Sequence, residues 1–167
     1  PGPSVPGSPV PGQVAGDGGR DESTGVTITT SPTDRGVLID FAWAGRAPAA
    51  AVFHWGDVTW IAFDRPANVA TADLTGGSAG QIQRVMVVDN PDRSLLLRLD
   101  TRPGLRPHVR RDENTWRVRL LEDAPLPDQP LIVTGGASGG LVIEGSDGAA
   151  AINAIDPISG IRMIVVP

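Results

Sequence analysis

From Val26 onward, the sequence is made of short runs of β-branched, aromatic and other apolar residues, separated by turn-forming residues. No segment sustains the 3.6-residue period of an amphipathic helix. Short runs bounded by Gly, Pro, Asn and Asp are typical of strands joined by tight turns. The pattern therefore predicts an all-β fold. The expected strands are Val26–Thr30, Val37–Trp43, Ala50–Trp55, Thr59–Phe63, Ile82–Val88, Leu95–Asp100, His108–Arg111, Thr115–Leu120, Leu131–Thr134, Leu141–Glu144, Ala151–Ile155 and Arg162–Val166.

Alternation along two of these runs separates a buried face from a solvated one, because successive side chains of a strand point to opposite sides. The residues expected in the core are Leu97, Leu99, Trp116, Val118 and Leu120. Those expected on the solvated face are Arg98, Asp100, Arg117 and Arg119. Opposite charges on that face are expected to pair across neighbouring strands.

A weak internal repeat suggests how the strands are grouped. Three copies of a three-stranded unit begin at VLIDFAW, LLLRLD and LVIEG. In the first two copies the third strand starts with Thr-Trp, so Trp60 and Trp116 are predicted to occupy equivalent core positions. The predicted architecture is a small antiparallel β-sandwich built from repeated three-stranded units.

Residues 1–25 differ from the rest of the chain in composition. They are rich in Pro and Gly and contain almost no apolar side chains, so they cannot bury enough surface to offset the entropy of ordering. We expect a disordered linker over 1–25, a β-sandwich over 26–124, and over 125–167 an additional β-unit or the start of a following β-domain. Because the chain opens on Pro1 and not on Met, we also expect a processed or excised segment.

Composition excludes several classes of function. The chain has no Cys and therefore no disulfide, thiolate nucleophile or iron–sulfur site. Its formal charge of −5 argues against general nucleic-acid binding, which normally requires a basic excess. No apolar run approaches the 18 or so residues that a transmembrane helix needs.

Motifs that support catalysis or cofactor binding are nearly absent. Gly136-Ala137-Ser138-Gly139-Gly140 fits the G-x-S-x-G pattern of serine hydrolases, but both histidines, His54 and His108, precede it, whereas those enzymes place the histidine after the serine. Two histidines without Cys or an H-E-x-x-H motif make a zinc site improbable, and we interpret His54 as structural. We expect no catalytic residue, no metal and no cofactor, and hence no enzyme.

One segment departs from the overall acidic character. Residues 93–119 contain eight arginines and carry a charge of +5, whereas the rest of the chain carries −10. One interpretation is a solvated sheet face. The other is a surface for an anionic partner, because the guanidinium group binds carboxylates and phosphates through a planar fork. The candidate residues for such binding, next to a Pro/Gly-rich bend, are Arg106, His108, Arg110 and Arg111.

Residues 37–120 resemble an AMIN-type domain, a periplasmic β-domain in which an apolar strand, a bend and two further strands occur twice. The stretches that carry the resemblance are AVFHWGDVTWIAFDRP and QIQRVMVVDNPDRSLLLRLD. The resemblance implies two packed small sheets, export to the periplasm or cell envelope, and binding to peptidoglycan or to other envelope proteins.

Three functions are compatible with this resemblance. The first is a non-catalytic binding or scaffold module that contacts peptidoglycan or a protein partner. The second is a structural subunit of a large periplasmic assembly, such as a flagellar-motor or secretion-system scaffold. The third is the targeting domain of a cell-wall enzyme whose catalytic part is absent from this sequence.

Overall fold

The computed structural model describes residues 25–89, 94–125, 132–135, 141–144 and 152–166. Residues 1–24 of the predicted linker lie outside this part of the chain, and so does the G-x-S-x-G motif at residues 136–140. The statements that follow concern the described residues.

The fold is all-β, as the sequence predicts, and every predicted strand is present, with ends that match the prediction or differ from it by no more than three residues. Eight strands precede the last predicted unit: β1 (Val26–Thr33), β2 (Gly36–Trp43), β3 (Ala50–Trp55), β4 (Val58–Phe63), β5 (Ile82–Val87), β6 (Leu95–Thr101), β7 (Arg106–Asp112) and β8 (Thr115–Leu121). Four short strands follow: β9 (Ile132–Gly135), β10 (Leu141–Glu144), β11 (Ile152–Ile155) and β12 (Arg162–Val166).

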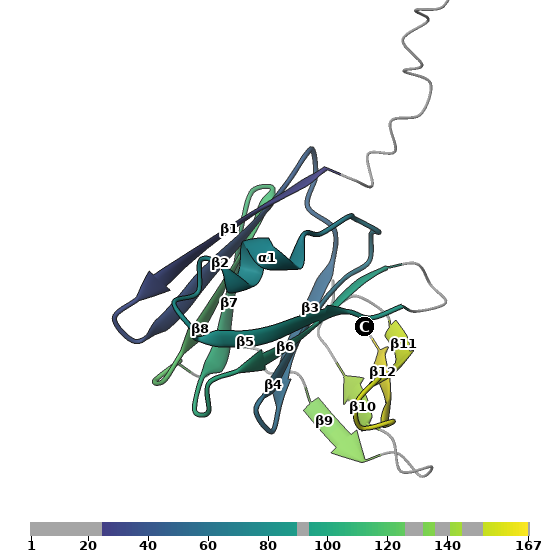
Figure 1. Ribbon diagram of the computed structural model, residues 1–167. Helices are drawn as coiled ribbons and strands as arrows, with labels where there is room; N and C mark the ends of the chain where they lie inside the picture. The colour runs from purple at the N-terminus through teal and green to yellow at the C-terminus, as the bar shows by residue number, and fades with distance from the viewer. Residues whose placement is uncertain (1–24, 90–93, 126–131, 136–140, 145–151, 167) are drawn as a thin grey trace, which may run out of the picture.

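The first eight strands form two four-stranded antiparallel sheets that pack face to face (Figure 1). The first sheet has the order β1-β2-β8-β7, and the second has the order β3-β4-β6-β5. Their inner faces supply one apolar core, since alternate residues of each central strand point inward. Fully buried members of this core are Val37, Ile39, Phe41, Ile61, Phe63, Leu97, Leu99, Val118 and Leu120.

Aromatic rings occupy one part of this core. Phe63 lies between Phe41 and Trp43, with ring centroids 5.0 and 5.1 Å apart and tilted planes. Tilted and edge-on ring pairs of this kind add about 0.5–1.5 kcal/mol beyond the burial of their area. The contact therefore links β2 in the first sheet to β4 in the second.

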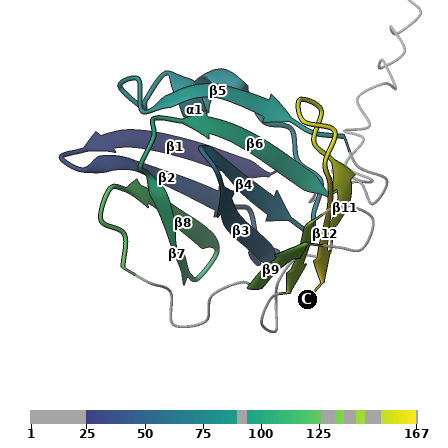
Figure 2. The ribbon, with the colours of Figure 1, turned by 90° about the horizontal axis from the view of Figure 1, so that it is seen from below.

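The last four strands form a third sheet, with the order β11-β12-β10-β9. In this sheet β10 and β12 run parallel, and the other neighbours are antiparallel. The third sheet covers the face of the second sheet that points away from the first (Figure 2). Ala154 and Met163 there join a second buried cluster that contains Phe53, Trp60 and Leu96.

The repeat differs from the predicted one. Strands β1–β4 and strands β5–β8 follow the same course: two strands enter one sheet, and the following hairpin enters the other sheet. As a result β2 pairs with β8 and β6 pairs with β4, so each half of the chain completes the sheet begun by the other. The connectivity thus repeats in units of four strands. The proposed third copy does not follow this course, because β10, β11 and β12 all lie in one sheet.

The two tryptophans are not equivalent, contrary to the prediction. Trp116 lies half-buried against the core between the first two sheets, and its indole N–H donates to the carbonyl of Pro48 (2.8 Å). Trp60 is only 2% exposed but points the other way, into the cluster beneath the third sheet, where it stacks on Phe53. In β4 it is Ile61 that faces the inner core. The tryptophans of the two Thr-Trp pairs therefore face opposite ways: Trp116 faces the core between the first two sheets, and Trp60 faces away from that core.

A short helix that the sequence did not reveal, α1 (Thr71–Thr75), covers the opening between β1 and β5 (Figure 1). Leu74 is fully buried there. Just after the helix, the backbone at Gly77 passes so close to β1 that a Cβ atom would lie 2.2 Å from the Thr30 carbonyl oxygen. A glycine is required for that contact.

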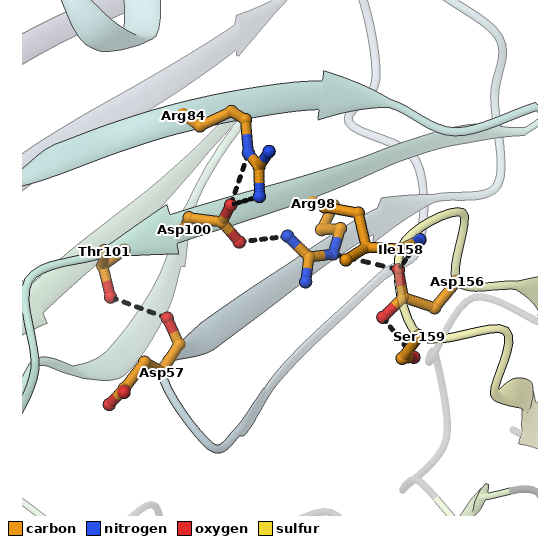
Figure 3. Close-up of polar contacts among 8 residues, drawn as sticks. All are labelled: Asp57, Arg84, Arg98, Asp100, Thr101, Asp156, Ile158 and Ser159. Atoms are coloured by element: carbon orange, nitrogen blue, oxygen red, sulfur yellow. Dashed lines mark hydrogen bonds and ion pairs between the residues drawn. The ribbon is translucent and has the colours of Figure 1, made fainter.

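Arg98, expected on a solvated face, is instead buried between the second and third sheets, with 6% of its surface exposed. Its guanidinium pairs with Asp100 on the same strand, and its Nε donates to the carboxylate of Asp156 (3.0 Å) in the turn between β11 and β12 (Figure 3). Asp156 also accepts bonds from the Ser159 hydroxyl and the Ile158 amide. These bonds, together with the attraction of Arg98, hold the pKa of Asp156 below its usual value even though burial opposes that shift.

Candidate functional site: an arginine face on β7 and β8

Four arginines and one histidine occupy the outer face of the β7–β8 hairpin. Val109 of β7 packs toward the inner core. Because successive side chains of a strand alternate, His108 and Arg110 on either side of it point outward. In the β7–β8 ladder Arg110 lies opposite Arg117, and His108 lies opposite Arg119. We call the outward-facing basic side chains, Arg106, His108, Arg110, Arg117 and Arg119, the arginine face; Asp112, two residues beyond Arg110, alternates to the same side of β7.

Only one of these basic side chains, Arg117, forms an ion pair with a carboxylate among the described residues. Arg117 donates from Nε to the carboxylate of Asp40 on β2 (2.9 Å), which raises the pKa of the guanidinium above its ordinary value. This pair confirms the expected pairing of charges across strands. Arg106, Arg110 and Arg119 form no ion pair within the described part of the chain.

The placement of like charges is unfavourable for folding. Arg110 and Arg117 are direct cross-strand neighbours, and like charges in that position destabilise a sheet. Three guanidinium groups form no ion pair among the described residues, and guanidinium binds carboxylates and phosphates through a planar fork, so this face has the chemistry to bind an anion.

Arg111, one of the predicted site residues, is not part of the arginine face. It alternates to the other side of β7, where its guanidinium lies 5.9 Å from the centre of the Trp116 ring and donates to the carbonyl of Glu113 (3.3 Å). The structure thus brings Arg106, His108 and Arg110 together and separates Arg111 from them. Arg119, which we expected to be paired across strands, takes its place. The alternation of Arg117 and Arg119 along β8, set beside β7, is the sequence signal that identifies it.

The two histidines differ in environment. His108 is half-buried within the arginine face. His54 lies on β3, with Nδ1 3.4 Å from the Thr59 hydroxyl. Burial, and then the positive charge of Arg106, lower the pKa of His54, so its imidazole is neutral at neutral pH. Strand β3 contacts β7, so His54 lies beside the Arg106 end of the arginine face.

Other features of the described residues carry little chemistry. No group of three or more His, Asp or Glu side chains is arranged to hold a metal ion in this part of the chain. No helix in it has the length and hydrophobicity to cross a membrane.

Comparisons of the chain with protein-family models, with curated proteins and with solved structures find no match. The resemblance to AMIN-type domains accordingly stays a prediction from the sequence.

Proposed function

We propose that this chain is a non-catalytic binding module of the cell envelope, and that it contacts peptidoglycan through the arginine face of β7 and β8. The observation that carries the proposal is the gathering of four outward arginines on one hairpin, three of them without an acidic partner among the described residues. The envelope location follows from the AMIN-like sequence pattern.

The geometry suits an extended, repetitive anion. Side chains two residues apart on a strand are spaced by roughly 7 Å, and neighbouring strands by about 4.8 Å. Arg106 and Arg110, four residues apart on β7, are thus separated by roughly 14 Å along the strand, and Arg119 on β8 lies between them, opposite His108. Peptidoglycan presents carboxylates at intervals along its stem peptides, and each carboxylate is a ligand for a guanidinium fork.

Net charge does not explain such binding. The chain as a whole carries −5, so a polyanion would be repelled by the molecule on average and attracted only at a local patch. Binding should therefore depend on a few arginines and weaken as salt rises, because exposed charges are screened over about 8–10 Å at ordinary ionic strength.

The experiment is co-sedimentation of the full chain with isolated peptidoglycan at increasing salt. Replacing Arg106, Arg110 and Arg119 together by Glu should weaken binding by at least about tenfold, since a tenfold change corresponds to only about 1.4 kcal/mol. A control triple variant with Glu at Arg35, Arg46 and Arg162, three arginines that do not belong to the arginine face, makes the same change in net charge and should bind as the parent does.

Equal sedimentation of the parent and the arginine-face variant would contradict the proposal. If the parent fails to sediment with peptidoglycan but is retained by an acidic envelope protein in an arginine-dependent way, the face binds protein and the peptidoglycan assignment is wrong.

A further inference from the structure

The two packed sheets have four edge strands, and three of them carry features that discourage pairing with another chain. Strand β1 contains Pro32 and is covered by α1. Strand β5 also contacts α1, and its register is interrupted between Ile82 and Arg84. Strand β7 contains Pro107 and three arginines. Helical cover, irregular register, proline and charge are the usual means by which proteins block edge-to-edge association.

Strand β3 has none of these features. Its sequence, Ala-Ala-Val-Phe-His-Trp, lacks proline and formal charge at neutral pH, and its ladder with β4 is regular. The strand ends in Trp55, one of the few large apolar side chains exposed in the described residues, at 48%. Among the edges of these two sheets, β3 alone carries none of these blocking features within the described residues, and β7 of the first sheet lies beside it.

The unpaired backbone groups of β3 can be identified from its turn. Trp55 and Val58 flank a two-residue loop and form a register pair, and such a flanking pair exchanges both hydrogen bonds. Bonded positions therefore alternate back along β3 from Trp55, and the amide of Asp64 accordingly donates to the carbonyl of Ala49 (3.0 Å). The residues that turn their N–H and C=O groups away from β4 are Ala50, Val52 and His54.

The side chains of β3 are complementary to those of a second, antiparallel β3. When two copies are centred on Val52, Phe53 lies opposite Ala51, His54 opposite Ala50, and Trp55 opposite Ala49. Each large ring then meets a methyl group, which is the alternation of large and small residues that permits close packing. In this register Ala50, Val52 and His54 of one copy lie opposite His54, Val52 and Ala50 of the other. The outward N–H and C=O groups of the two strands can therefore bond to each other.

We infer that two copies of this chain associate through β3, antiparallel about Val52, and so extend the second sheet across a twofold axis. Association of this kind is isologous, with the same strand on both sides. Shifting the register by two residues in either copy reduces the overlap, and centring on His54 sets two imidazoles against each other. The self-complementarity of Ala49–Trp55 favours a second copy over an unrelated peptide. This inference is independent of peptidoglycan binding.

Electrostatics predicts how the association responds to salt. Strand β7 contacts β3, and Arg106 lies near enough to His54 to lower its pKa. Pairing therefore brings the positive charges of both copies to the same seam. Salt screens that repulsion, so the dimer should become more stable as ionic strength rises, whereas binding of an anion to the arginine face should weaken.

Sedimentation equilibrium of the full chain tests the inference. We expect a concentration-dependent dimer that strengthens with salt. Trp55→Arg should weaken the dimer at least about tenfold, because it removes the ring opposite Ala49 and adds charge at the edge. Val87→Arg, at a residue of similar exposure (46%) on β5, is the control and should leave the dimer unchanged.

Cross-linking tests the register. The chain has no cysteine, so Val52→Cys introduces a single thiol whose symmetry mate lies across a hydrogen-bonded pair. Cα atoms about 5.5 Å apart in such pairs lie within the range of a disulfide. Mild oxidation should link Val52→Cys into dimers and leave Val87→Cys mainly monomeric. A chain that is monomeric at every concentration, or that cross-links no better at position 52 than at position 87, would overturn the inference.

Discussion

Arg98 shows how one side chain attaches a whole layer of this fold. Its guanidinium lies 5.7 Å from the centre of the Trp60 ring and bridges Asp100 and Asp156, with less than a tenth of either Arg98 or Asp156 exposed. Buried charges are costly to desolvate, so each depends on its partner. The ion pair therefore specifies where the β11–β12 turn lies against β6.

We predict that Arg98→Met destabilises the chain by about 3–5 kcal/mol in urea denaturation, because the methionine fills part of the volume but leaves Asp156 buried without a counter-charge. Arg84→Met is the matched control. Arg84 binds Asp100 at the exposed end of the same network (2.6 Å), and an exposed pair contributes only about 0–1 kcal/mol. Equal losses in the two variants would show that the Arg98–Asp156 pair does not hold the third sheet.

The β7–β8 hairpin, which carries the arginine face, contains a strained turn. Its loop residue Glu113 has φ of +53°, in the left-handed region that side chains other than glycine and asparagine rarely adopt. The neighbouring Asn114 holds the turn against β2: its side-chain amide donates to the carbonyl of Trp43 (2.8 Å), and its own carbonyl accepts from the Trp43 amide (2.9 Å). The turn is thus kept by its contacts despite the backbone cost.

We predict that Glu113→Gly stabilises the chain by about 0.5–1 kcal/mol, since relief of the left-handed strain exceeds the added entropy of a glycine in the unfolded state. Asp112→Gly, one residue earlier in the regular strand, should destabilise by a similar amount. Thermal unfolding of both variants measures the difference. A loss of stability in Glu113→Gly would mean that the Glu113 side chain contributes more than its backbone costs.

The strands were predictable because their signals are local. Alternation and turn residues mark each of the twelve strands within a few residues of its ends. The residues predicted to face the core on β6 and β8 do so. Of the residues predicted on the solvated face, Arg98 is instead buried. Helix α1 escaped because five residues are too few to show a helical period. The face of Trp60 was misjudged because β4 is buried on both sides, and a strand covered on both sides shows no alternation.

The candidate site was predictable only in part. The excess of arginine in residues 93–119 is visible in composition, and Arg106, His108 and Arg110 do lie together. The separation of Arg111 depends on alternation along β7, and the inclusion of Arg119 depends on the register of β7 against β8; a composition argument contains neither. The burial of Arg98 depends on the third sheet, and its partner Asp156 lies 58 residues further along the chain.

The exchange of strands between the two halves of the chain bears on how the molecule can be divided. Because β2 is paired by β8 and β6 is paired by β4, neither half contains a complete sheet, and each exposes the apolar residues that the other covers. The connection between the halves, around residues 66–70, belongs to no strand. A break between residues 68 and 69 removes no ladder hydrogen bond.

We therefore expect residues 1–68 and 69–167, expressed separately, to be unfolded alone and to reconstitute the native fold when mixed, as followed by β-sheet circular dichroism and by dispersion of the amide resonances. Phe63→Asp in the first fragment, at a fully buried position between the sheets, should abolish reconstitution. Folding of either fragment by itself would be inconsistent with this expectation. In a chain with this connectivity, the two halves must bind each other for either sheet to form, so folding of the whole chain is also a binding reaction between its halves.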